Sequence, residues 1–268
     1  MNYEFLDCDI RDSVAHVALL GTDGIPAGEF CDEMVDMLMR LQDDRAVRVV
    51  LLTDAGGPWD MAFDVRAIAE SWHSGDGPGL SAGNLDTIRR LTTMMNDLPK
   101  PIIVAVSGDV RDDGFGLLMN ADVRLAAPTA TFTAGDMITG MLPDWGLSHL
   151  LPRRMGTGRT LEMIWSGRSI PADEAYTIGL IDRLVPGDAW EETVGELVRR
   201  IAGLPQPAVQ MSKLAVQQSA QFDLTTAMSL EYEAQEKCWD SEETAAALAA
   251  HLEGQVPDFS VILSDEDA

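Results

Sequence analysis

The sequence has few basic residues and almost no lysine. Nineteen Lys and Arg residues stand against 44 Asp and Glu residues, which gives a formal net charge of −25 at pH 7. Lysine occurs at three positions only, Lys100, Lys213 and Lys237. A surface this negative repels nucleic acids and anionic membranes, so we expect neither as a partner. We interpret the excess of acids as a solvated surface.

Cysteine is scarce as well. Cys8, Cys31 and Cys238 fit no metal-binding spacing and cannot all pair, so we expect no metal site and a reducing compartment. The N-terminal end lacks the basic and apolar regions of a signal peptide, and no apolar run approaches the roughly 20 residues of a membrane span. The HExxH, CxxC and serine-elbow motifs are also missing. These absences favour a cytoplasmic protein.

Strand and helix patterns alternate along the first half of the chain. Short runs rich in Val, Ile and Leu predict four strands, at residues 16–20, 47–53, 101–108 and 123–127. Apolar residues at helical spacing predict helices over residues 28–44 and 85–99. Strand–helix–strand repeats with short connections indicate parallel strands joined by right-handed crossovers. The sequence therefore predicts an α/β fold.

The second half of the chain is mainly helical in pattern. We place the division near residue 195, with a core over residues 1–195 and a C-terminal helical region over residues 196–268. No stretch rich in Gly or Ser separates the two parts, so we do not expect independent domains.

One carboxylate lies in an otherwise apolar segment, "GMLPDWGLSHLLPRRMG", residues 140–156. Asp144 follows a proline and precedes a tryptophan, which is ordinary turn chemistry. Its neighbours Leu142, Trp145 and Leu147 would also shield it from water in part. Partial desolvation raises the pKa of a carboxyl group and makes it a better base. The segment thus allows two readings, a turn residue and a general base.

Several motifs occur together in one order: "VRVVLLTDAGGPWDMAFDV", "PKPIIVAVSGDV", "NADVRLAAPTATF", the segment containing Asp144, and "SGRSIPADEAYTIGLIDRLVP". In this order the chain resembles the crotonase superfamily of enoyl-CoA hydratases and isomerases over residues 10–258. The resemblance implies a spiral of ββα repeats and assembly into trimers or dimers of trimers through the C-terminal helices. It also implies an oxyanion hole formed by the backbone N–H groups of Met61 and Asp113.

The resemblance also assigns acids to the reaction. A hydratase of this family uses two glutamates to activate water, and these fall here at Gly116 and Asp136. Asp144 falls where family isomerases carry their working carboxylate. We therefore expect weak hydration and favour a double-bond shift with Asp144, or Asp136, as the base. The alternative role for Asp136, which follows Gly135, is that of a turn residue.

The resemblance makes an acyl-CoA the expected substrate, with coenzyme A entering as part of that substrate and no separate cofactor. We assign substrate binding to four positions, Asp64, Gly114, Trp145 and Lys213. The segments "GTDGIPAGEF" and "HLEGQVPDF" lack the basic residues that often contact coenzyme A. Two alternatives follow from this lack. One is a coenzyme A-independent hydrolase of cyclic β-diketones, whose histidine would fall near Met137, and the other is a non-catalytic family member.

Overall fold

The computed structural model describes residues 3–20, 27–55, 57–61, 70, 73–74, 79–135, 137 and 140–260. Two of the predicted site residues, Asp64 and Asp136, lie outside the described residues.

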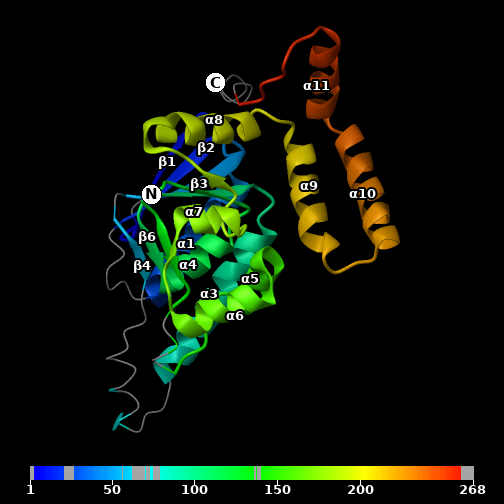
Figure 1. Cartoon of the computed structure of the whole chain (residues 1–268). Coiled ribbons are helices and arrows are strands. Elements are labelled where there is room, and N and C mark those ends of the chain that lie inside the picture. The colour runs from blue at the N-terminus through cyan, green and yellow to red at the C-terminus, as the bar shows by residue number, and fades with distance from the viewer. Residues whose placement is uncertain are drawn as a thin grey trace.

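A six-stranded sheet forms the centre of the molecule (Figure 1). Its strand order is β1 (Leu6–Arg11), β2 (Val14–Leu19), β3 (Val49–Asp54), β5 (Ile102–Val106), β7 (Val123–Ala126) and β10 (Arg183–Leu184). The first pair is antiparallel, and every later neighbour is parallel. The four predicted strands correspond to β2, β3, β5 and β7, so these predictions and the α/β class are confirmed.

A smaller sheet pairs β4 (Trp59–Met61), β6 (Asp109–Arg111), β8 (Thr131–Thr133) and β9 (Ile170–Pro171), in that order. After the antiparallel pair β1–β2, successive strand pairs place their first strand in the large sheet and their second in the small sheet, and a helix follows. The pairs β3–β4 and β5–β6 are followed in this way by α3 (Gly79–Asp97) and α4 (Asp112–Met119). This repetition is the expected ββα spiral.

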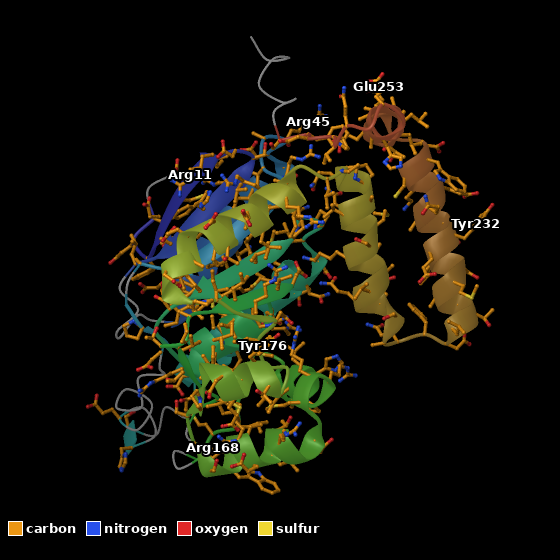
Figure 2. All side chains as sticks on the ribbon, turned by 45° about the horizontal axis from the view of Figure 1, so that its top comes forward. Arg11, Arg45, Arg168, Tyr176, Tyr232 and Glu253 are labelled. Carbon is orange, nitrogen blue, oxygen red and sulfur yellow. The ribbon has the colours of Figure 1, made fainter. Side chains whose placement is uncertain are left out.

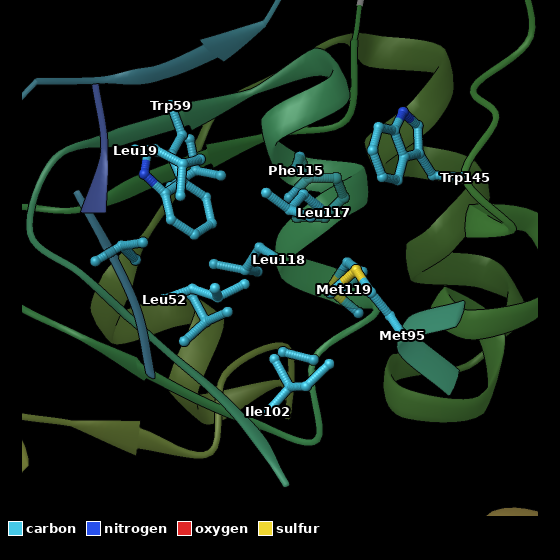
Figure 3. Packing of buried hydrophobic residues seen from close by; sticks show 14 of the residues in the cluster. Leu19, Leu52, Trp59, Met95, Ile102, Phe115, Leu117, Leu118, Met119 and Trp145 are labelled. Carbon is cyan, nitrogen blue, oxygen red and sulfur yellow. The ribbon is translucent and has the colours of Figure 1, made fainter. Parts of the chain in front are cut away.

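The main core lies between the large sheet and helices α1 (Ala27–Asp43), α3 and α4. Buried Leu52 and Ile102 from the sheet pack there with Met95 from α3 and Leu118 from α4 (Figure 3). Alternate residues of the same strands face a second core on the other side of the sheet. Central strands buried on both faces require near-continuous apolar runs, and this requirement made them easy to recognise in the sequence.

After β8 the chain forms α5 (Leu147–Met155) and α6 (Thr157–Ser166), returns to the small sheet as β9, and continues into α7 (Ala172–Thr177). Helix α8 (Trp190–Ala202) then covers the second face of the large sheet through Val194, Val198 and Ala202. The predicted division at residue 195 falls inside α8, and this helix packs on the large sheet.

Three further helices, α9 (Gln206–Ser219), α10 (Leu224–Trp239) and α11 (Glu242–Leu252), project from the body as an arm (Figure 1). Arg48, directly before β3, ties the last helix of the arm to the body. The Arg48 guanidinium, 4% exposed, pairs with Glu243 of α11 at 2.8 Å and donates to the carbonyl oxygens of Ala202 and Leu204. Among the described residues, no helix has the length and apolar character needed to cross a membrane.

Candidate active site

The two residues predicted to supply oxyanion donors lie at the ends of neighbouring strands. Strands β4 and β6 are parallel, with Trp59 opposite Val110 and Asp60 opposite Arg111. Met61 ends β4, and α4 starts directly after β6 at Asp112. The carboxyl ends of parallel strands meet at one edge of a sheet, so the backbone around Met61 and the first turn of α4 lie at the same edge.

Helix α4 approaches β4 very closely at Gly114. A Cβ atom at this position would lie 2.3 Å from the carbonyl oxygen of Trp59, which no side chain tolerates. Gly114 therefore has a packing role, because its lack of a side chain lets the first turn of α4 lie against β4. Its predicted contact with substrate stays a prediction.

Two non-glycine residues at this edge adopt left-handed backbone conformations. Asp112, the first residue of α4, has a φ of +47°, and Trp145 has a φ of +54°. Such conformations cost of order 1–3 kcal/mol and persist only where the surroundings impose them. The contacts of Trp145 account for its conformation.

One face of α4 holds Trp145 at three points, through Asp113, Gly116 and Asn120. The indole Nε1 donates to Asp113 Oδ1 at 2.8 Å, and Asn120 Nδ2 donates to the Trp145 carbonyl oxygen at 3.0 Å. Between them, a Cβ atom at Gly116 would lie 2.2 Å from Cγ of the indole. Figure 3 shows Trp145 beside α4. The indole is 2% exposed and fills the space that a side chain at position 116 would need.

The carboxyl group of Asp144 is half-buried next to this tryptophan. Its backbone carbonyl accepts from Leu147 N at 2.9 Å, so the predicted turn is present. Burial also raises the pKa of the side chain from 3.8 to about 6, as expected for partial desolvation. Of the three predicted neighbours, Trp145 and Leu147 are buried, whereas Leu142 is 72% exposed and does not shield the carboxylate.

Asp113 is a second buried acid at the same place. Its side chain is 2% exposed, and Oδ2 has no hydrogen-bond partner within the described residues. Burial, helped by the nearby Asp144 carboxylate, raises the pKa of Asp113 to about 7. The Cys31 thiol of α1 lies within the field of both carboxyl groups, and burial raises its pKa too, so it stays neutral. Two carboxyl groups with raised pKa values meet here.

Comparisons with known proteins agree with this architecture. A family model described as enoyl-CoA hydratase/isomerase matches residues 27–261. The chain belongs to the enoyl-CoA hydratase/isomerase family.

Relatives in this family carry different names. The chain is 31% identical over 224 residues to a short-chain-enoyl-CoA hydratase of Clostridium acetobutylicum, covering 82% of this chain and 83% of the relative. It is 28% identical over 235 residues to a 1,2-epoxyphenylacetyl-CoA isomerase of Escherichia coli, with coverage of 86% and 89%. A crystal structure of an enoyl-CoA hydratase/isomerase from Cupriavidus metallidurans superimposes with a TM-score of 0.83 at 28% identity, covering 96% of each chain. The crotonase fold is thereby confirmed.

Lys213 has partners inside its own chain. Its ammonium nitrogen pairs with Asp122 Oδ2 at 2.8 Å and donates to the carbonyl oxygen of Lys100 at 3.2 Å. The side chain is 8% exposed and joins α9 to the start of β5. These contacts give Lys213 a structural role, and none of them brings it to Asp113 or Asp144.

The sequence reasoning missed the side chain of Asp113, because the family resemblance assigned only its backbone N–H. A weak signal was present. Asp113 starts the segment "DGFGLLM", in which every other residue is apolar or glycine, and an acid among residues that pack fully is unusual.

Proposed function

We propose that this protein shifts a carbon–carbon double bond within an acyl-CoA thioester through an enolate, without adding water. The observation that carries the proposal is the Trp145 indole beside Gly116. A family hydratase positions its water with a glutamate at this place, whereas here the side chain is absent and an apolar ring fills the space. A site without that carboxylate favours proton transfer over hydration.

Asp144 is the proposed base. Its carboxylate takes a proton from C2 of a 3-enoyl thioester, and the electron pair of the C–H bond moves into the thioester carbonyl as a dienolate forms. The same carboxyl group then returns the proton at C4, which leaves a 2-enoyl thioester. A pKa of about 6 supports this role, because such a group is mostly ionised at neutral pH yet more basic than an exposed aspartate.

Two backbone donors would hold the enolate oxygen. Met61 N–H and Asp113 N–H are suited to this role because β4 and β6 end side by side at this edge. The N-terminal end of α4 adds positive potential where negative charge develops. The scheme needs no cofactor, and coenzyme A enters only as part of the substrate.

The rates of isomerisation and of hydration, measured on the same protein, test this proposal. We expect turnover of trans-3-hexenoyl-CoA to the conjugated isomer, and hydration of crotonyl-CoA slower than by an efficient hydratase by roughly 10²–10⁴-fold. Hydration that is faster than isomerisation would contradict the proposal. Turnover of a bicyclic β-diketone without binding of coenzyme A would favour the hydrolase alternative instead.

We also propose that the protein works as a homotrimer or a dimer of trimers built through the arm. Leu224, Met228 and Tyr232 follow each other at intervals of four residues on α10, and each is more than half exposed. Figure 2 shows Tyr232 on the outer part of the arm. An apolar stripe of this kind supports a protein partner, here a second copy. Light scattering at micromolar concentration should give three or six chain masses, and a monomer mass would contradict this assembly.

A further inference from the structure

The carboxyl group of Asp113 is buried with only one hydrogen bond. Oδ1 accepts from the Trp145 indole at 2.8 Å, while Oδ2 has no partner within the described residues. An ionised carboxylate that loses its water without gaining partners is strongly disfavoured. A neutral carboxylic acid in the same place costs much less, and its carbonyl oxygen still accepts the indole N–H, which can only donate. The geometry favours the neutral form.

The charged and polar groups around Asp113 also favour its neutral form. Asp112 on α4 and Asp144 in the loop before α5 are acids that raise the pKa of Asp113, and the indole N–H of Trp145 opposes them. From α1, Cys31 contributes a neutral thiol, whose own pKa is raised in part by Asp32. No cationic group of the described residues is among those that shift the pKa of Asp113. Ionisation of Asp113 would therefore add an uncompensated negative charge.

We infer that Asp113 is a positioning residue: in its neutral carboxylic acid form it holds Trp145 through the indole hydrogen bond. Ionisation of Asp113 prevents turnover. The inference rests on the proposed function, because the charge of an ionised Asp113 would destabilise the proposed enolate. The backbone N–H of Asp113 is a proposed donor to the enolate oxygen. A carboxylate on the same residue would repel the negative charge that this donor is meant to stabilise.

The inference predicts a narrow pH optimum. Asp144 must be ionised and Asp113 neutral, so turnover should peak between their pKa values of about 6 and about 7. With trans-3-hexenoyl-CoA as the probe, kcat of the wild-type protein should fall about tenfold per pH unit above 7.

Asp113→Asn is the main variant, because it keeps the acceptor for the indole and cannot ionise. The ratio of kcat at pH 8.5 to kcat at pH 6.5 should rise roughly 20-fold over the wild-type ratio. Asp112→Asn is the matched control, since it removes an adjacent carboxylate that does not bind the indole, and the alkaline fall should remain. Trp145→Phe should move the fall to higher pH, because it removes the hydrogen bond that favours the ionised form. An alkaline fall that persists in Asp113→Asn would overturn the inference.

A measurement without substrate separates this inference from the proposed function. A group whose pKa is raised in the folded state stabilises the fold below its unfolded pKa, and this stabilisation is lost as pH rises through the folded value. The urea midpoint of the wild-type protein should therefore drop below that of Asp113→Asn as pH rises from 5 to 8.5. This divergence without isomerase activity would reject the proposed reaction and keep the neutral Asp113. Parallel midpoints would reject the neutral Asp113 whatever the reaction is.

Discussion

Helices α4 and α10 differ in how much of their surface is buried. Seven of the eight residues of α4 are buried, whereas α10 has twice the length and buries only Cys238. The cover of α4 includes the Trp145 indole, which comes from a loop 26 residues beyond the end of the helix. The apolar stripe of α10 receives no such cover within the described residues. Helix α4 is thus covered by other parts of the chain, whereas the apolar stripe of α10 is exposed among the described residues.

The largest expected effect breaks the site and leaves the fold intact. Asp144→Asn should lower kcat/KM for the 3-enoyl thioester by roughly 10²–10⁴-fold, because the amide cannot take a proton. The free energy of unfolding at pH 7.5 should not decrease, since burial disfavours the ionised carboxyl. Asp136→Asn is the comparison. Small and equal losses in both variants would remove the general-base mechanism.

The next effect breaks the link between the two regions. Arg48→Met should lower the free energy of unfolding by about 3 kcal/mol, because it removes the buried partner of Glu243 and the donor to the carbonyl oxygens of Ala202 and Leu204. Hydrogen exchange should rise first in α11, which this arginine ties to the sheet. Arg45→Met is the control, because Arg45 is exposed (Figure 2) and its loss should change stability little. Equal effects of the two variants in urea unfolding would contradict the link.

A third change tests the contact between α4 and the indole. Gly116→Ala places a methyl group against Trp145 and should lower the free energy of unfolding by about 1–3 kcal/mol through overpacking. The control is Gly158→Ala in α6, where nothing lies within 4 Å of the added atom. It should be neutral or stabilise by about 0.5 kcal/mol, because Ala favours a helix over Gly. Urea unfolding that ranks the two variants in the other order would show that Gly116 has free space.

The smallest expected effect concerns the arm alone. Ser241 caps α11 by accepting from Thr244 N at 3.1 Å, so Ser241→Ala should cost about 1 kcal/mol. Ser229→Ala within α10 removes an exposed hydroxyl that donates to the Thr225 carbonyl of the same helix and caps no helix end, and its effect should be close to zero. Turnover should be unaffected by either change in a protein that keeps its assembly state. A loss of turnover in Ser241→Ala would mean that the arm contributes to the site.

The elements of the fold could be predicted because their signals are local. Buried parallel strands require runs such as residues 101–108, and α1 requires apolar residues at helical spacing. The predicted division at residue 195 falls inside α8. Helix α8 has the same amphipathic pattern whether it covers a sheet or starts an arm, and only tertiary packing distinguishes the two.

The sequence by itself determined the α/β class, the family resemblance, the loss of a glutamate at Gly116 and the position of a carboxylate at Asp144. Only the tertiary structure shows which group occupies the space of the missing glutamate side chain. It placed the Trp145 indole over Gly116, 29 positions away, and turned the side chain of Asp113 into its hydrogen-bond partner. The physical reason is that burial and contact are properties of neighbours in space. A carboxyl group's protonation depends on which groups replace its water, and no local pattern records them.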